Sequence, residues 1–133
     1  MDTNEAITPV LDWFKSYDCS GGCPVEAGLE QISGKWKGLV IYHLLQGTLR
    51  FNALARALGD VTQRSLTKQL RELERDGIVH REVFAEVPPR VEYSLTKKGR
   101  ALQPVIEALA VWGQSEALGA TPVTASAAPR QSE

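Results

Sequence analysis

Apolar residues recur at helical spacing along most of the chain, whereas one stretch contains two runs in which apolar, often β-branched residues alternate with polar ones. Pro24 stands where a helix can start, Asn52 and Thr62 where helices can be capped, and Gly59 and Gly77 where helices can end. The pattern predicts a short extended piece at 48–51 and helices over 8–17, 24–33, 36–46, 52–59, 62–77 and 96–118.

Two of these helices carry further expectations. The segment 36–46 is apolar almost all round, so it should form the centre of the core. The final helix should be bent near Gly99 and Pro104, because proline removes a backbone hydrogen bond inside a helix. In the helix that starts at Pro24, the expected buried stripe consists of Val25, Leu29 and Ile32.

The alternating stretch, residues 81–99, predicts a β-hairpin that turns at Pro88-Pro89. Helices, a short strand, a helix-turn-helix, a hairpin and a final helix occur in the order of a winged helix-turn-helix. We therefore predict an α+β, mainly α fold with a β-hairpin wing and extra N- and C-terminal dimerisation helices. The predicted parts are an N-terminal helix and linker (1–22), the DNA-binding domain (23–100), a dimerisation helix (101–118) and a disordered tail (119–133).

The helix over 62–76 separates leucines from cations. On a helical wheel the leucine face holds Leu66, Leu70 and Leu73, and the opposite face holds Arg64, Lys68, Arg71 and Arg75. A recognition helix needs such a docking face and such an outward face. The residues predicted to contact DNA are Gln63, Arg64, Ser65, Thr67, Lys68 and Arg71. The alternative is an ordinary solvated face, with the arginines paired to Glu72, Glu74 and Asp76.

The chain has a net charge of −1, which by itself favours no partner. Residues 48–100, however, hold 11 Lys/Arg against 7 Asp/Glu, and the rest of the chain holds 4 against 9. A basic middle between acidic ends is typical of one surface that faces nucleic acid. Lys35, Lys37 and Arg50 are predicted to clamp phosphates outside the recognition helix.

Arg90 leaves the Pro88-Pro89 turn, and a rigid wing tip would carry it to the phosphates or the minor groove. We predict a DNA contact there. The competing interpretation is a surface ion pair across the hairpin with Glu86.

The first and last helices carry more apolar surface than one small domain needs. They are predicted to form a two-fold homodimer interface. Its residues are Val10, Leu11, Trp13, Phe14, Leu102, Val105, Ile106, Leu109 and Trp112.

The sequence resembles the HxlR-type family of bacterial winged helix regulators over residues 23–113. The matching segments are CPVEAGLEQISGKWK (23–37), RFNAL (50–54), TQRSLTKQLRELERDGIVHR (62–81) and EVPPRVEYSLTKKGRAL (86–102). The resemblance implies a homodimeric DNA-binding repressor or activator. Several members sense oxidants or electrophiles through a cysteine, and Cys23 matches the usual position of that cysteine, whereas Cys19 and the leading helix lie outside the family pattern.

Cys23 directly precedes Pro24, where backbone N–H groups at a helix start favour a thiolate, although Glu26 opposes this. Cys23 could be oxidised and then resolved by Cys19 or by a cysteine of a partner subunit. The alternative is a pair of inert thiols. We expect no metal site, because the two cysteines supply only two ligands and His43 and His80 are expected in the core and on the surface.

No catalytic motif is present, so we predict no enzyme and no cofactor. The favoured partners are double-stranded DNA with a palindromic operator and a second copy of the chain; the effector is unknown. A winged-helix module that binds protein, and a small thiol redox protein, remain the alternatives. No apolar run approaches the roughly 20 residues of a membrane span, so we expect a cytoplasmic protein without membrane contact.

Overall fold

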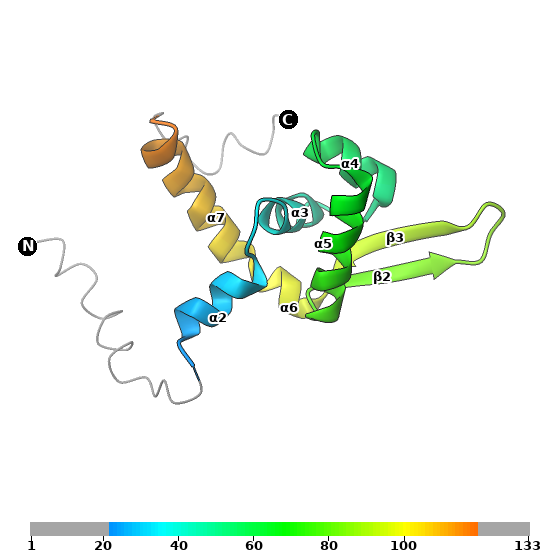
Figure 1. Cartoon of the computed structure of the whole chain (residues 1–133), viewed down its shortest axis with the longest axis horizontal. Helices are drawn as coiled ribbons and strands as arrows, with labels where there is room; N and C mark the ends of the chain where they lie inside the picture. The colour runs from blue at the N-terminus through cyan, green and yellow to red at the C-terminus, as the bar shows by residue number, and fades with distance from the viewer. Residues whose placement is uncertain (1–21, 120–133) are drawn as a thin grey trace, which may run out of the picture. The chain divides into compact units, whose positions relative to one another are not determined.

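The computed structural model describes residues 22–119, which belong to two compact units, 1–32 and 33–133. The first unit contributes α2 (Pro24–Gln31), with Cys23 at its N-cap. The second contains α3 (Lys37–Leu44), β1 (Leu49–Arg50), α4 (Phe51–Leu58), α5 (Gln63–Arg75), β2 (Val79–Phe84), β3 (Arg90–Leu95), α6 (Lys97–Arg100), α7 (Gln103–Trp112) and a π-helical turn, η2 (Gly113–Ala117) (Figure 1). None of the helices described is both long enough and apolar enough to span a membrane.

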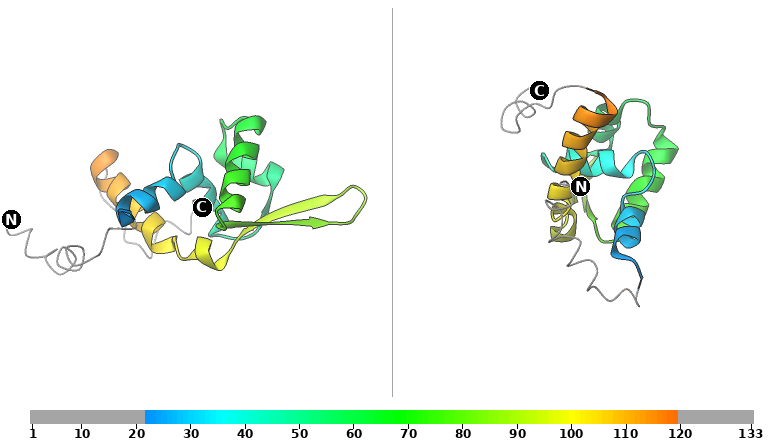
Figure 2. Two further views of the ribbon diagram at one scale, coloured as in Figure 1. Left: turned by 60° about the horizontal axis from the view of Figure 1, so that its bottom comes forward. Right: turned by 90° about the vertical axis from the view of Figure 1, so that its left-hand side faces the viewer.

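The three strands form an antiparallel sheet in the order β1-β3-β2. Leu49 lies opposite Tyr93 on the β1 side of β3, and Arg81 lies opposite Tyr93 on the β2 side. β2 and β3 continue beyond the helices as the wing (Figure 2). The predicted winged helix-turn-helix fold is confirmed.

The core of the second unit lies between α3, the inner faces of α4 and α5, and the base of the sheet. Leucine spacing on α5 explains its orientation, since these side chains are buried while the cationic face remains outside. The buried apolar residues are Val40, Ile41, Leu44, Leu54, Leu66, Leu70, Leu73, Ile78, Val79, Tyr93, Leu95 and Ile106.

Both ends of α5 follow the sequence prediction. The Thr62 side chain accepts a hydrogen bond from the backbone N–H of Ser65 (3.0 Å), which satisfies one of the free donors at the helix start. Gly77 has a φ of 77°, a left-handed conformation that lets the chain turn from α5 into the wing.

The predicted final helix is in fact two helices. Thr96 caps α6 by accepting from the N–H of Gly99 (3.0 Å), and its hydroxyl donates to the carbonyl oxygen of Gly77 (2.6 Å). A Cβ at position 99 would lie 2.3 Å from the carbonyl oxygen of Ile78, so only glycine fits there. Pro104 stands in the first turn of α7, where its missing N–H breaks the run of helical hydrogen bonds.

Two smaller expectations are wrong. Arg50, not Asn52, is the N-cap of α4, and Asn52 lies inside the helix. The stripe expected on α2 is not buried, since Val25 and Leu29 are exposed. α3 lies at the centre of the core as predicted, although Leu39 on this helix is exposed.

Several predictions lie outside the described residues. They concern the helix over 8–17, the tail from residue 120, and the residues Val10, Leu11, Trp13, Phe14 and Cys19.

Candidate nucleic-acid interface

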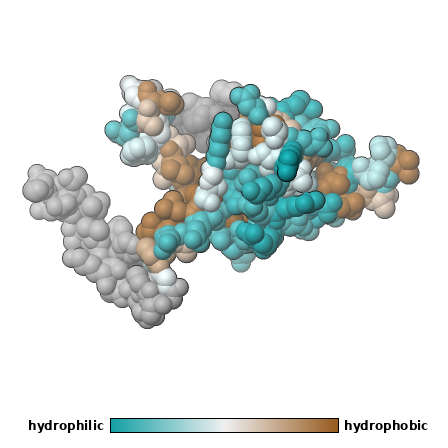
Figure 3. All heavy atoms as spheres, in the orientation of Figure 1, coloured by the Kyte–Doolittle hydropathy of each residue, from teal (hydrophilic) through white to brown (hydrophobic). Residues whose placement is uncertain are grey.

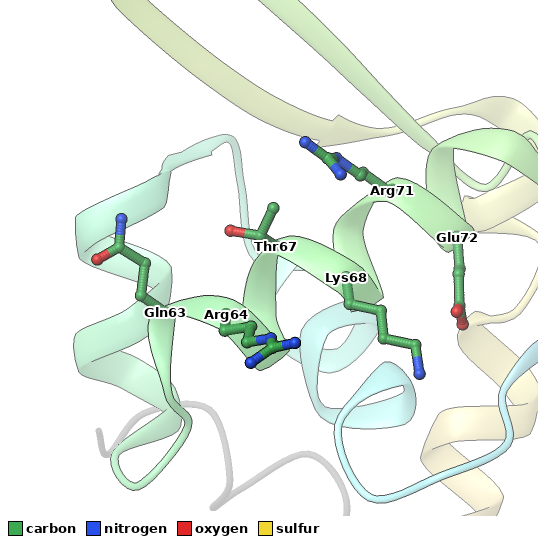
Figure 4. Close-up of a pocket in the computed structure, with 6 residues that line it drawn as sticks. All are labelled: Gln63, Arg64, Thr67, Lys68, Arg71 and Glu72. Carbon is green, nitrogen blue, oxygen red and sulfur yellow. The ribbon is translucent and has the colours of Figure 1, made fainter.

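The outward face of α5 is an open, polar surface. Its shallow hollow has a volume of about 750 Å³ and is lined by Gln63, Arg64, Thr67, Lys68, Arg71 and Glu72 (Figure 4). Gln63, Arg64, Lys68 and Arg71 are exposed, whereas Ser65 and Thr67 are half-buried at its edge. Hydrophilic residues cover this part of the molecule (Figure 3). The structure therefore brings the residues predicted on this helix onto one accessible surface.

The start of α5 adds to the positive potential of this face. Gln63 and Arg64 are the first two residues of the helix, where backbone N–H groups lack helical partners and the helix dipole is positive. Amide and guanidinium groups at this end can donate to base edges or to phosphate oxygens.

The cations divide into two classes by what they contact. Five are bound within the protein: Lys37 to Glu72, Arg75 to Asp76, Arg90 to Glu86 and Glu92, Lys98 to the Asp76 carbonyl, and Arg100 to the Leu95 carbonyl. Within residues 22–119, eight others make no ion pair or hydrogen bond through their side chains: Lys35, Arg50, Arg56, Arg64, Lys68, Arg71, Arg81 and Lys97. Three of these eight lie on the outward face of α5, which leaves that face with uncompensated positive charge.

Lys37 does not lie where a phosphate clamp was predicted. It is only 6% exposed, and its amine lies 2.6 Å from Oε1 of Glu72, so the pair ties the start of α3 to α5. The hydrogen bond from Lys37 lowers the pKa of the Glu72 carboxyl below its ordinary 4.5. Lys37 holds the recognition helix in place and is not available to DNA.

The Lys37–Glu72 pair predicts a pH-dependent stability. Folding lowers the pKa of Glu72, so the ion pair contributes fully to the free energy of unfolding above about pH 4.5. That contribution is lost as the pH falls through the lower pKa that Glu72 has in the folded protein. Lys37→Met should therefore lower the urea midpoint at pH 7, and the difference from wild type should shrink below pH 4.5. Urea unfolding at several pH values measures this. A difference that does not change with pH would show that the substitution acts through packing alone.

Arg90 is bound on the outer face of the wing. Its guanidinium lies 2.7 Å from Glu86 and 2.5 Å from Glu92, and its Cζ lies 3.8 Å from the centre of the Phe84 ring. Its side chain is 23% exposed. Hydrogen bonds from Arg90 lower the pKa of the Glu86 carboxyl. This geometry favours the ion-pair interpretation over the predicted DNA contact.

Arg90→Ala is accordingly expected to lower the melting temperature slightly and to leave the salt dependence of DNA binding unchanged. The reason is that the charge removed is one that two carboxylates already neutralise. Thermal unfolding and binding titrations at several salt concentrations measure the two effects. If Arg90→Ala lowered the slope of log affinity against log salt concentration by about 1, Arg90 would instead be a DNA contact.

Two other predicted clamps lie on the surface. The Lys35 amine lies 4.6 Å from the centre of the Trp36 ring. Arg50 is exposed and lines a groove of about 410 Å³ that also contains Asn52, Arg56 and Arg90. Arg50 can still serve as a phosphate contact, because its charge is not paired.

The sequence pattern did not indicate Arg56 or Arg81 as candidate DNA contacts. Arg56 could not be found in this way, because the groove that it lines is formed only when α4 and the wing come together in the fold. For Arg81 a signal exists: it alternates with Val79 and Val83, so all three point to the same face of β2.

α7 carries an apolar groove of about 470 Å³ lined by Pro104, Val105, Ala108, Leu109 and Trp112, and hydrophobic residues gather along this helix (Figure 3). Val105, Leu109 and Trp112 are exposed, as a dimer interface requires. Ile106 is buried in the core instead, and Leu102 is half-buried. Ile106 is thus a correction to the predicted interface: it lies on the inner side of α7.

The candidate redox and metal residues are dispersed. Cys23 is a free, exposed thiol at the N-cap of α2, and its side chain makes no capping hydrogen bond. His80 is exposed beside Glu82, and His43 is half-buried, where burial lowers its pKa. In the described part of the chain, no three His, Cys, Asp or Glu side chains cluster as metal ligands.

Comparisons with known proteins agree with this architecture. A family model described as HxlR-like helix-turn-helix matches residues 31–119. YdeP of Bacillus subtilis (strain 168), an uncharacterized HTH-type transcriptional regulator, is 57% identical over 99 residues, 74% of this chain and 77% of YdeP. The oxidized form of the redox regulator HypR is 56% identical, with a TM-score of 0.68 over 71% of this chain and 97% of HypR. The reduced form of the B. subtilis transcriptional regulator YodB is 34% identical, with a TM-score of 0.65 over 74% of this chain and 98% of YodB.

Proposed function

Because the chain belongs to the HxlR-like helix-turn-helix family of transcriptional regulators, which are not enzymes, we propose that α5 is its recognition helix and enters the DNA major groove. Gln63, Arg64, Thr67 and Lys68 would face base edges, with Ser65 beside them. Arg71, further along the helix, would contact the DNA backbone.

One observation carries this proposal: on the outward face of α5, Arg64, Lys68 and Arg71 make no ion pair or side-chain hydrogen bond within the described residues, whereas Arg75 at the end of the helix is bound to Asp76. Arg64, Lys68 and Arg71 face solvent from one side of a helix whose other side is buried. Uncompensated charge on one rigid surface is what supplies phosphate contacts and counterion release on DNA. Arg50 and Lys35 would add outer phosphate contacts.

Helix-turn-helix regulators bind DNA and typically act as dimers, and we propose that this chain does so through α7. The exposed apolar groove on α7 would be covered by the same groove of a second copy. A two-fold dimer would place two α5 helices about one DNA turn (~34 Å) or more apart, so the operator should be palindromic.

Leu109→Glu is expected to convert the dimer into a monomer at micromolar concentration, because it places a charge in the apolar groove. Leu109 is 52% exposed. Val111→Glu is the matched control, since Val111 lies on the same helix, is 51% exposed and does not line the groove. Sedimentation velocity measures both. A wild-type monomer, or equal effects of the two variants, would contradict an interface at this groove.

Selection of genomic DNA fragments with the purified protein tests the proposed function. The expected result is enrichment of fragments that share a palindromic sequence. Recovery of fragments without a common sequence, with binding insensitive to salt, would instead favour a winged-helix module that binds protein.

A second proposal concerns control by oxidants through Cys23. It is supported by the exposure of this thiol and by the similarity to HypR, which is named a redox regulator. A hydroperoxide would oxidise the thiol to a sulfenic acid with release of water or an alcohol. A second thiol, from Cys19 or from a partner subunit, would then form a disulfide with loss of water. Repeating the DNA selection with peroxide-treated protein and with Cys23→Ser tests this: the oxidant should change binding only when Cys23 is present.

A further inference from the structure

A cleft separates the recognition helix from the wing. Its volume is about 320 Å³, and it is lined by Thr67, Leu70, Arg71, Glu74, Arg81 and Tyr93. Leu70 and Tyr93 are buried and form its apolar floor. The two arginines come from different elements, Arg71 from α5 and Arg81 from β2.

The strand register fixes which way Arg81 points. In β2 and β3 the pairs Val79–Leu95 and Arg81–Tyr93 share one face of the hairpin, and Val79, Leu95 and Tyr93 on this face are buried. The pairs Glu82–Glu92 and Phe84–Arg90 belong to the opposite face, where Arg90 binds its carboxylates. Arg81 therefore faces α5, and Arg90 faces away.

The other wall of the cleft is the side of α5 turned toward the wing. Figure 4 shows Arg71 directed to the side on which the hairpin strands pass, whereas Glu72 points to the other side, where it binds Lys37. Neither Arg71 nor Arg81 makes an ion pair or side-chain hydrogen bond within residues 22–119, although Glu74 lines the same cleft. Two free guanidinium groups line one hollow without a bound carboxylate, so the hollow favours an anion.

We infer that this cleft holds one backbone phosphate of the bound DNA, with Arg71 and Arg81 donating to its oxygens from the helix and from the wing. This inference rests on the proposed function. A helix seated in the major groove has the sugar-phosphate backbone along its flank, on the side where a wing stands. Guanidinium groups match phosphate geometry through paired N–H donors. The contact makes Arg81, at the base of the wing, a determinant of affinity and of helix placement, but not of base choice.

Arg81→Ala in the full-length protein tests this inference. Binding is titrated by fluorescence anisotropy on the selected operator and on a random duplex of equal length, at several salt concentrations. Both affinities should fall by the same factor, about tenfold, and the salt slope should fall by about 1. Arg81→Lys should keep the slope and recover part of the affinity, since lysine keeps the charge without the paired donors.

Arg90→Ala is the matched control, because it removes the same side chain from the opposite face of the same hairpin. Its salt slope should equal that of wild type. The double variant Arg71→Ala/Arg81→Ala adds a further check. If both residues hold one phosphate, the combined loss should be smaller than the product of the single losses.

Two outcomes would overturn the inference and separate it from the proposed function. If wild type binds an operator and Arg81→Ala binds with unchanged affinity and slope, the cleft holds no phosphate, while the role of α5 stands. If the wild type selects no DNA, the proposed function and the inference both fail. Calorimetric titration with inorganic phosphate forms the second arm: tight binding lost in Arg81→Ala would assign the cleft to a free anion instead of DNA.

Discussion

Replacing Leu66 with alanine is expected to lower the free energy of unfolding by about 2–5 kcal/mol. Leu66 lies on the inner face of α5 and is 0% exposed. Alanine would leave a cavity directly beneath the first turns of the recognition helix, and the surrounding core would close it only in part. Urea unfolding at a fixed protein concentration measures the loss, and DNA affinity should fall with it as the folded population falls.

Leu39→Ala serves as the control for Leu66→Ala, because Leu39 belongs to the neighbouring α3 but is 41% exposed. Leu39→Ala should lower the free energy of unfolding much less than Leu66→Ala does, since less apolar surface returns to water. If both variants lost less than about 1 kcal/mol, the leucine face of α5 would not be the docking face of the helix.

Arg64→Ala is expected to weaken operator binding by about 1–3 kcal/mol, or roughly 5- to 150-fold in affinity. Arg64 lies in the first turn of α5, is exposed and has no ion-pair partner within the described residues, so its guanidinium is free to bond the edge of a guanine. Competition titrations with single-base operator variants should show relaxed preference at one position.

Arg75→Ala is the matched control on the same helix. Arg75 stands at the last residue of α5 and is hydrogen-bonded to Asp76, with the nitrogen Nε 3.0 Å from Oδ1. Its loss should change the affinity much less and leave base preference intact. Equal weakening of operator and random DNA by Arg64→Ala would make Arg64 a backbone contact without a role in base choice.

The elements that carry function could be predicted from the sequence because local signals determine them. Leucines at helical spacing between Thr62 and Gly77 predicted both the inner and outer faces of α5. The alternation of apolar and polar residues on either side of Pro88-Pro89 predicted the wing. It did not predict which face of the wing lies toward α5.

The roles of individual cations depended on tertiary neighbours and could not be predicted in the same way. Lys37 and Arg64 are both cations near the start of a helix, yet Lys37 meets Glu72 of another helix and Arg64 meets solvent. The β-hairpin register brings Arg90 and Glu92 to the same outer face, which favoured the ion pair over the predicted DNA contact.

The final helix could be predicted from the sequence only in part. Apolar spacing continues from Leu102 to Trp112, which predicted one amphipathic helix with a single dimer face. In the structure a new helix starts at Gln103, with Pro104 in its first turn, and Ile106 packs into the core. Only some of the apolar residues are therefore left exposed for a dimer interface.

Amide chemical shifts of nitrogen-15-labelled protein, followed during titration with the selected operator fragment, test whether α5 is the helix that reads DNA. The largest changes are expected from Gln63 to Arg71 of α5 and at Arg81 of the wing, with small changes along α7. Changes concentrated on α7 or around Arg90, with α5 unaffected, would contradict the assignment of α5 as the helix that reads DNA.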